Sequence, residues 1–550
     1  MAPPGEPRTE NQESQPAPAR ADLQAPRRGT LYGRRGAVAA GQPLASLVGL
    51  DVLRAGGNAI DATIAVSAVM VVVQPYSSHL GGDGFALIRT AAGETAALNA
   101  GGRAPVAATP DAYAGGIPQR GCAAVAVPGL VDAWFAIHSR FATKPMAELL
   151  APAIAFARDG FPLSRGVSLV IAGGQRWLAE DPGLAEVFLR DGPPAAGATL
   201  RQPDLARTLE AIAQGGRDAF YGGEPGRRIV EHVQESGGRL ATEDLAENQA
   251  VWGEPLRIQY HDWTVYEQPL PSQGFMTLEA LNIVEGFGLG EHPLASAEAV
   301  HPAVEAIRLA FSDRDAFIGD PDAVAVPIER LLSKEYAAEQ RGRIGPRAGE
   351  TVAASYGDTT SFAAADEYGN LVSFIQSIFD PWGSGVLVPG TGVILNNRMS
   401  GFSLDPQSPN VLRPGKRTVH TLNTWLLERE GTVYAGGTPG ADTQIQVNLQ
   451  AITAIADWGL GAQSAIDSPK WAITSHAGRR LTTVLPGDGL VLESRFPAET
   501  AADLERRGHR VVRASAWEAA LSRMQIVARQ PDGALAVASD LRAEGAALTW

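Results

Sequence analysis

The feature that most constrains the fold lies between Thr359 and Ser377, where two strand-like segments surround a tight turn. The segment "TTSFAAA" leads toward the turn "EYGN", and "LVSFIQS" follows it. β-Branched and aromatic residues on both sides of a glycine-containing turn predict a β-hairpin. A second hairpin is predicted where "TWLLERE" and "TVYAGG" flank Gly431, and the helical pattern "QIQVNLQAITAIADWG" comes next. The sequence from Thr359 onward therefore predicts a sheet packed against helices.

Helical patterns and short strands alternate before this hairpin, from about residue 35 to residue 340. In "GLDVLRAGGNAIDATIAVSAVMVV" two helices are predicted to break at Gly56 and Gly57, because glycine favours a helix C-terminus. The glycine-rich loop 81–84 then leads into a strand. We assign Asp61 to helix capping and Asp83 to a turn in this loop. The prediction is a mixed arrangement of helices and strands.

The chain is expected to divide into three parts. Residues 1–34 are rich in proline, alanine and polar residues and lack the apolar core of a signal peptide, so we expect a disordered tail. Residues 35–358 form the first structured part, and a segment rich in glycine, alanine and serine precedes the second part, 359–550. With 550 residues, of which 45% are hydrophobic, the chain can fill a large core, and two lobes are expected.

Charge and composition favour a small molecule as the partner. The net charge is −14, and the sequence has no run of lysine and arginine with interleaved aromatic residues, so no nucleic acid and no anionic membrane surface is expected to bind. The longest apolar run, 62–73, is shorter than the roughly 20 residues that span a membrane. A cytoplasmic location is therefore expected. The single cysteine, Cys122, lies in an apolar segment and is expected to be a buried, unreactive thiol.

Sequence signals of the common hydrolases are missing, which leaves a threonine nucleophile as the candidate for amide cleavage. Neither the G-x-S-x-G motif of serine hydrolases nor the H-E-x-x-H motif of zinc hydrolases occurs, and none of the nine histidines forms a closely spaced pair. If the Thr359 hydroxyl attacked the Asp358 carbonyl and water then opened the ester, Thr359 would begin a new chain. The alternative interpretation is that Thr359 and Thr360 are ordinary strand residues.

A terminal threonine supplies both reactive groups for amide cleavage. Its α-amino group, with a pKa of roughly 7.7 to 8.0, is neutral enough to accept the proton of its own hydroxyl. The Thr359 oxygen would then attack an amide carbonyl and form an acyl-enzyme, which is released to water or to an amine. Such a mechanism requires no cofactor and no metal.

The chain resembles the γ-glutamyltransferase family, whose precursors split themselves at a threonine into a large and a small subunit. The segments that carry the resemblance are "LRAGGNAIDATIA" (53–65), "SSHLGGDGF" (77–85), "VPGLVDAW" (127–134), "LLAPAIAFARDGFPLS" (149–164), "PLPSQGF" (269–275), "TTSF" (359–362), "GVILNNRMSGFSL" (392–404), "PGKR" (414–417) and "GTPGA" (437–441). The resemblance implies an α+β fold of the N-terminal-nucleophile hydrolase type, an αββα sandwich of two sheets between helical layers. It places Thr359 at the start of a central strand, with 35–358 and 359–550 as the two subunits of one precursor.

The resemblance also implies roles for particular residues. Ser377 takes the place of a second hydroxyl residue that supports the nucleophile. The backbone N–H groups of Gly440 and Ala441 are expected to form the oxyanion hole, where the family usually has two glycines. In "NNRMSGF", Arg398 and Gly401 stand where γ-glutamyl-specific members have an amide and an acid that hold the α-ammonium of the substrate.

Arg103, Arg398, His420 and Thr421 are the expected substrate-binding residues. Arg103 lies in "GGRAP", His420 and Thr421 replace a serine pair of the family, and Phe379 replaces an asparagine. Arginines without a carboxylate for an ammonium favour an acidic amide that lacks a free α-amino group, such as an oxamate-like or glutaryl-like amide. Two alternatives stay open: a true γ-glutamyltransferase or glutathione hydrolase, and an inactive relative that only binds its ligand.

Overall fold

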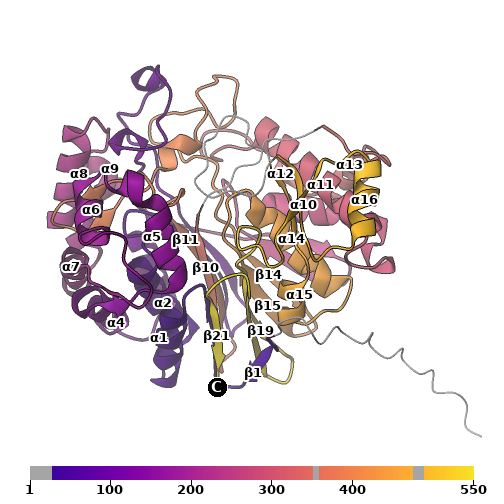
Figure 1. Cartoon of the computed structure of the whole chain (residues 1–550), viewed down its shortest axis with the longest axis horizontal. Coiled ribbons are helices and arrows are strands. Elements are labelled where there is room, and N and C mark those ends of the chain that lie inside the picture. The colour runs from indigo at the N-terminus through magenta and orange to yellow at the C-terminus, as the bar shows by residue number, and fades with distance from the viewer. Residues whose placement is uncertain (1–27, 351–357, 475–487) are drawn as a thin grey trace, which may run out of the picture.

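The protein is a sandwich of two sheets between layers of helices (Figure 1). The computed structural model describes residues 28–350, 358–474 and 488–550. Residues 1–27 of the expected tail lie outside this part of the chain, whereas Leu31–Gly33 forms strand β1 and pairs with β20 (Leu535–Ser539), so these three residues do not belong to a disordered tail. Among the described residues, no helix combines the length and the apolar character needed to cross a bilayer.

Sheet 1 contains the hairpin predicted from Thr359. Its strands in spatial order are β21 (Ala546–Thr549), β2 (Gly36–Ala40), β10 (Thr360–Asp366), β11 (Leu371–Ser377), β3 (Asp83–Arg89), β4 (Thr95–Ala100) and β7 (Val251–Gly253). All neighbouring pairs are antiparallel, and Thr360 lies opposite Gln376 across the β10–β11 hairpin. The hairpin prediction is confirmed, and β10 occupies an interior position between β2 and β11.

Sheet 2 contains the second predicted hairpin, around Gly431. Its strands in spatial order are β1, β20, β19 (Gln525–Arg529), β15 (Thr432–Gly437), β14 (Trp425–Arg429), β9 (Trp263–Glu267) and β8 (Leu256–Tyr260). Smaller sheets pair β5 (Phe161–Pro162) with β6 (Thr199–Leu200), β12 (Leu387–Val388) with β13 (Val393–Ile394), and β17 (Gly489–Glu493) with β16 (Trp471–Thr474) and β18 (Val511–Ala514).

Helices cover the outer face of each sheet (Figure 1). The helices that precede β8 in the chain are α1 (Pro43–Arg54), α2 (Ala59–Val73), α3 (Leu130–Phe141), α4 (Met146–Asp159), α5 (Arg165–Leu178), α6 (Pro182–Phe188), α7 (Pro203–Tyr221), α8 (Glu224–Glu235) and α9 (Thr242–Glu247). Those after it are α10 (Phe275–Val284), α11 (Ala297–Phe317), α12 (Ile328–Leu331), α13 (Lys334–Arg341), α14 (Thr443–Ala456), α15 (Ala462–Asp467) and α16 (Ala498–Arg506). In the view of Figure 1, the first group lies to the left of the sheets and the second to the right.

The break between α1 and α2 follows the prediction from the sequence. Gly56 adopts a φ of 83°, a left-handed conformation that glycine tolerates at a helix C-terminus. Asn58 then caps α2, and the Asp61 side chain accepts a hydrogen bond from the Asn58 N–H at 2.8 Å. The capping role assigned to Asp61 is confirmed. All fifteen residues of α2 are buried, so this helix lies in the core and its apolar run does not face a lipid phase.

Alternate residues of β10 face the two halves of the core. Phe362 and Ala364 pack in the large cluster that contains α2, whereas Ala363 and Ala365 pack between the two sheets. This alternation is that of a strand buried on both faces. Small side chains between the sheets also allow polar contacts across them, since Ser361 Oγ donates to the Gly437 carbonyl of β15 at 3.0 Å. The sandwich thus holds the start of β10 against the end of β15.

Each sheet takes strands from both sides of Thr359. In sheet 1, β10 pairs with β2 and β11 pairs with β3, so strands of 359–550 lie between strands of 35–358. In sheet 2, β14 pairs with β9 in the same way. The expectation of two lobes is therefore wrong for these two parts, because neither contains all the strands of either seven-stranded sheet. The prediction of an αββα sandwich is confirmed.

Candidate active site

Two hydroxyl groups converge on the peptide bond that precedes Thr359. Thr359 Oγ1 donates a hydrogen bond to the Asp358 carbonyl oxygen at 2.6 Å, and Ser377 Oγ donates to the same oxygen at 2.7 Å. Both side chains are buried, and Thr359 stands at the N-terminal end of β10 while Ser377 ends β11. The hairpin register therefore brings together two residues that are 18 positions apart in the sequence.

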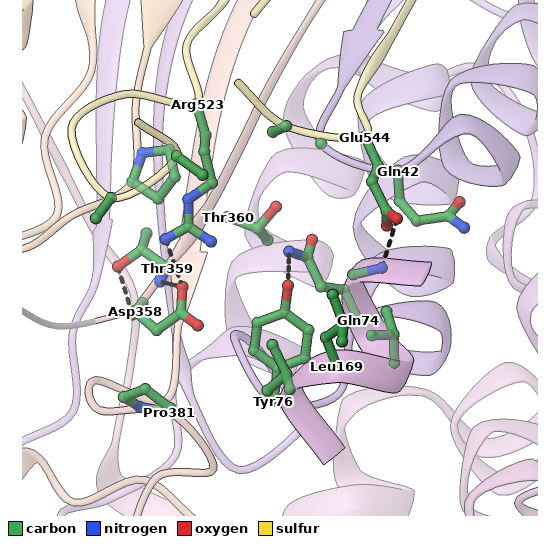
Figure 2. Close-up of a pocket in the computed structure, with 18 of the residues that line it drawn as sticks. Gln42, Gln74, Tyr76, Leu169, Asp358, Thr359, Thr360, Pro381, Arg523 and Glu544 are labelled. Atoms are coloured by element: carbon green, nitrogen blue, oxygen red, sulfur yellow. Dashed lines mark hydrogen bonds and ion pairs between the residues drawn. The ribbon is translucent and has the colours of Figure 1, made fainter. Parts of the chain in front are cut away.

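The Asp358 side chain is also fixed, as Figure 2 shows. Its Oδ1 accepts a hydrogen bond from the Thr359 N–H at 2.8 Å and forms an ion pair with Arg523 Nη2 at 2.8 Å. The backbone N–H of Asp358 donates to the Phe379 carbonyl at 2.9 Å. These contacts hold the Asp358–Thr359 peptide from both sides, so its carbonyl keeps one orientation toward the two hydroxyls.

Phe379 links this peptide bond to a buried arginine. Its N–H donates to Ser377 Oγ at 2.7 Å, and its φ of 84° is unusual for a residue with a side chain. The guanidinium carbon of Arg398 lies 4.2 Å from the centre of the Phe379 ring, which is the geometry of a cation–π contact. Phe379 thus contacts the Ser377 hydroxyl with its backbone and Arg398 with its ring.

Arg398 belongs to a buried cluster with Asp83 and His420. Arg398 Nε lies 3.0 Å from Asp83 Oδ2, and His420 Nε2 lies 3.1 Å from the same oxygen. Burial would raise the pKa of Asp83, but the hydrogen bond from His420 and the charge of Arg398 hold it below its ordinary value. Burial, together with the charge of Arg398, lowers the pKa of His420 to about 4, so this imidazole is neutral at neutral pH.

The cluster changes the electrostatic argument made from the sequence. Asp83 is not a turn residue as expected but the first residue of β3; its carboxylate accepts the Gly102 N–H at 2.9 Å and pairs with Arg398. The expectation of an arginine without a nearby carboxylate is therefore wrong for Arg398. Only the Nε of Arg398, however, contacts Asp83. Among the described residues, neither Nη1 nor Nη2 has a hydrogen-bond partner, although the side chain is 1% exposed. Two buried nitrogen donors of Arg398 are therefore available to a ligand.

The polar groups of Arg103 and Thr421 have hydrogen-bond partners outside this cluster. Arg103 Nη2 pairs with Asp322 Oδ2 at 3.2 Å, its Nη1 donates to the Gly415 carbonyl at 2.9 Å, and its side chain is 35% exposed. Thr421 is buried, and its carbonyl accepts a hydrogen bond from Asn423 Nδ2 at 2.9 Å. The structure thus brings Arg398 and His420 together, but it gives Arg103 acidic partners of its own.

A cavity of about 440 Å³ opens beside Thr359 (Figure 2). One wall is apolar and comes from α5 and from the segments that follow α2 and β11; its side chains are Tyr76, Val167, Leu169, Val170, Trp177 and Trp382. Polar side chains also line the cavity and include Arg523, Arg542 and Glu544, of which Glu544 accepts a hydrogen bond from the Gly166 N–H of α5. None of Arg103, Arg398, His420 and Thr421 is among the described residues that line this cavity. Thr359 lines this cavity, whereas Arg398 and Phe379 do not.

Apart from Asp358 and its neighbours Thr359 and Thr360, the cavity residues were not found from the sequence. Burial and the nearby Asp358 carboxylate raise the pKa of Tyr76 to about 12, so its hydroxyl stays protonated and can take part in neutral hydrogen bonding. Gln74 Nε2 donates to this hydroxyl at 3.0 Å. Arg542 is held by Glu493 and Asp540. These residues come from segments that are far apart in the sequence, and no motif marks them.

The loop expected to form the oxyanion hole follows β15. Pro439 lines the cavity together with Thr359, and Gly440 and Ala441 come next, before α14. Gly440 has a φ of 133°, and Ala441 has a φ of 49°, which is the left-handed region in which a side chain is strained. Gly440 and Ala441 are not themselves among the cavity-lining residues. The loop lies next to the start of β10, and its role as an oxyanion hole stays a prediction.

We expect opposite effects on stability from two substitutions in this loop. A Cβ at residue 440 would lie 2.1 Å from Thr443 Oγ1 and would also be strained at this φ, so Gly440→Ala should lower the thermal midpoint, with a cost of about 1 to 3 kcal/mol. Ala441→Gly removes a strained side chain and should raise the midpoint slightly. Thermal unfolding of both variants checks this, and a stabilised Gly440→Ala protein would contradict the conformation of the loop.

Comparisons with known proteins show which proteins this chain resembles. The family model described as gamma-glutamyltranspeptidase matches residues 45–550. A glutathione hydrolase-like YwrD proenzyme of Bacillus subtilis is 37% identical, covering 94% of this chain and 99% of that protein. An oxamate amidohydrolase proenzyme of Klebsiella pneumoniae is 36% identical, covering 92% and 96%. The crystal structure of a cephalosporin acylase from Bacillus halodurans superimposes with a TM-score of 0.88 at 37% identity, covering 96% of this chain and 98% of that one.

Proposed function

Because the chain belongs to the gamma-glutamyltranspeptidase family, and is thus an amide hydrolase of the N-terminal-nucleophile type made as a proenzyme, we propose a specific cut and a specific class of substrate. The precursor cleaves itself between Asp358 and Thr359, and Thr359 becomes the nucleophile. The mature enzyme hydrolyses amides whose acyl group carries a carboxylate and has no free α-amino group. The resemblance seen in the sequence and the predicted enzyme class are confirmed by the family match; the cut, the site residues and the substrate are our proposal.

The observation that carries the proposal is the pair of hydroxyls on the Asp358 carbonyl. Thr359 Oγ1 is 2.6 Å from the oxygen of the bond to be cut, so a small rotation brings it onto the carbonyl carbon. Oγ1 then bonds to that carbon while the C–N bond breaks, the nitrogen takes a proton and becomes the amine of Thr359, and water opens the resulting ester. The Ser377 hydroxyl, 2.7 Å from the carbonyl oxygen, stabilises the negative charge that develops there.

The same groups serve the mature enzyme. The new amine accepts the proton of Thr359 Oγ1, which attacks the substrate carbonyl, and the proton passes to the departing amine. Water then attacks the acyl ester and releases the acid. The N–H groups of Gly440 and Ala441 are the proposed donors to the substrate oxyanion, and Ser377 supports the nucleophile. The large cavity with its apolar wall would accept the amine portion of the substrate.

The proposed acyl specificity rests on Arg398. Its two unpartnered nitrogens form the planar fork that binds a carboxylate with two hydrogen bonds, and its guanidinium lies over the ring of Phe379, whose backbone N–H donates to Ser377 Oγ. An α-ammonium would face this cation, and the only carboxylate of the cluster, Asp83, is already bound to Arg398 and His420. The name of the oxamate amidohydrolase relative describes a substrate of the same chemical class. In this proposal His420 orients Asp83 and does not itself bind the carboxylate.

Two anilides that differ only in the α-amino group test the proposal. N-Glutaryl-p-nitroanilide and γ-glutamyl-p-nitroanilide have the same leaving group. The processed enzyme should show a kcat/KM at least about tenfold higher for the glutaryl compound, because a repulsion of about 1.4 kcal/mol between the α-ammonium and Arg398 suffices for this ratio. Release of nitroaniline measures both rates. Equal turnover, or a preference for the γ-glutamyl compound, would overturn the acyl specificity and favour the glutathione hydrolase alternative.

A further inference from the structure

Three potential metal ligands meet in the outer layer of sheet 2, away from the cavity beside Thr359. They are His301 and Glu305 of α11 and His509, which lies in the turn between α16 and β18. One ligand atom from each residue lies within 4.8 Å of the other two, and His301 Nδ1 is 2.8 Å from His509 Nε2. Helix α11 explains why His301 and Glu305 lie close together, because residues four positions apart project from the same face of a helix.

The contacts around the cluster orient His301 and Glu305 as metal ligands are usually oriented. His301 Nε2 lies 2.9 Å from the Gly345 carbonyl, which fixes the proton on Nε2 and leaves the Nδ1 lone pair toward His509. Glu305 Oε2 accepts hydrogen bonds from Arg308 Nε at 2.8 Å and from the Gly349 N–H at 3.1 Å. Among the described residues, Oε1 accepts none. His301 and Glu305 are therefore each held by one atom while another faces the cluster or accepts no hydrogen bond, and His509 contacts the cluster through Nε2.

A small cavity adjoins the cluster. It has a volume of about 60 Å³ and is lined by Glu305 and His509, among others. This is enough room for a water molecule next to the carboxylate and the imidazole. Two imidazoles, one carboxylate and a water are the four ligands of many tetrahedral zinc sites.

We infer that His301, Glu305 and His509 bind a divalent metal ion of the zinc class. With Zn–N distances of about 2.0 to 2.1 Å, two nitrogens in a tetrahedral site stand roughly 3.3 Å apart, so the two imidazoles need to separate by only about half an ångström. The ion takes the place of the N–H proton that now lies between them, and this proton moves to Nδ1 of His509, so both imidazoles bind the ion in their neutral form. None of the three residues lines the cavity beside Thr359, so the ion has no part in the amide chemistry.

The site has a structural consequence. His301 and Glu305 precede Thr359 in the chain and His509 follows it, so the ion would join the two parts across the proposed cut. The joining of two separate fragments rests on the proposed function, whereas the binding of the metal does not. The sequence could not indicate the site, because 208 positions separate the two histidines.

Metal titration of the full-length protein tests the inference. After treatment with a chelator, the wild-type protein should bind one equivalent of Co²⁺ with the intense visible absorption of a tetrahedral site, and Zn²⁺ should displace it and raise the thermal midpoint. His509→Gln keeps an amide donor for His301 but is a poor ligand, so it should weaken binding by roughly 100-fold or more. The matched control is His232→Gln on α8, outside the cluster, which should bind as the wild type does.

Two outcomes would overturn the inference. One is a wild-type protein that binds no Co²⁺ or Zn²⁺ at one equivalent, which would leave a hydrogen-bonded histidine pair without a metal function. The other is binding of equal affinity in the wild type and in His509→Gln. Circular dichroism of each variant confirms that the fold is kept, and the titration of the wild type stands by itself if a variant does not fold. Both readouts are independent of the processing and of the activity at Thr359.

Discussion

Thr359→Ala is expected to leave the precursor as one chain of full length and to reduce amide hydrolysis by at least about 10⁴-fold, because the substitution removes the hydroxyl required for both steps. The wild-type protein should separate into two fragments that meet between Asp358 and Thr359. Intact-mass analysis measures the cut, and release of nitroaniline from the glutaryl anilide measures the activity. The alanine side chain is smaller than threonine and the position is buried, so the variant should fold.

Thr360→Ala is the matched control for this experiment. Thr360 is the next residue, also buried, and lines the same cavity, but its hydroxyl does not contact the Asp358 carbonyl. We expect this variant to be cut as the wild type is. An intact wild-type chain after long incubation, or cleavage of Thr359→Ala at the same bond, would show that Thr359 is not the residue that cuts the chain.

Replacing Arg398 is expected to abolish the preference for acyl groups that carry a carboxylate. Arg398→Gln alone would leave the Asp83 carboxylate buried without its cation, which costs about 3 to 5 kcal/mol of stability. The double variant Arg398→Gln/Asp83→Asn removes both charges and should keep more of the thermal stability. Its kcat/KM for the glutaryl anilide should fall by about 100-fold, which is the effect of losing a charged hydrogen-bonded contact. The kcat/KM for the γ-glutamyl anilide should fall by a smaller factor.

Arg103→Gln tests whether Arg103 or Arg398 binds the acyl carboxylate, since the sequence analysis assigned substrate binding to both. Arg103 pairs with Asp322 and Asp320, and its side chain is partly exposed, so its loss should have little effect on the ratio of the two anilide rates. If Arg103→Gln abolishes hydrolysis of the glutaryl anilide and the Arg398 double variant does not, the carboxylate is bound by Arg103 and our proposal for Arg398 is wrong. Thermal midpoints measured in parallel separate a loss of binding from a loss of folding.

The sequence was a good guide to those elements whose signals are local. The β10–β11 and β14–β15 hairpins were predicted from strand-like segments around glycine turns, and the break before α2 from Gly56 and Gly57. In each case the residues that determine the structure lie within a few positions of one another. The proximity of Thr359 and Ser377 is of the same kind, since the register of a single hairpin sets it.

Features that depend on distant segments were missed. Asp83 looked like a turn residue because its loop is rich in glycine, yet its partners Arg398 and His420 lie 315 and 337 positions away. Tyr76 and Trp382 line the same cavity from segments that share no motif. The exchange of strands between the two parts was also missed, because a strand pattern shows that a segment pairs but does not show with which segment it pairs.

This exchange of strands makes the proposed cut a one-way step for the folding of the protein. In the uncut precursor, β10 and β2 belong to one molecule, so refolding is a reaction of a single chain. Once the chain is cut, β10 and β11 must find β2 and β3 on a separate fragment, and refolding becomes a bimolecular reaction that slows on dilution. The mature protein would then persist through slow unfolding, with its lifetime set by the height of a kinetic barrier.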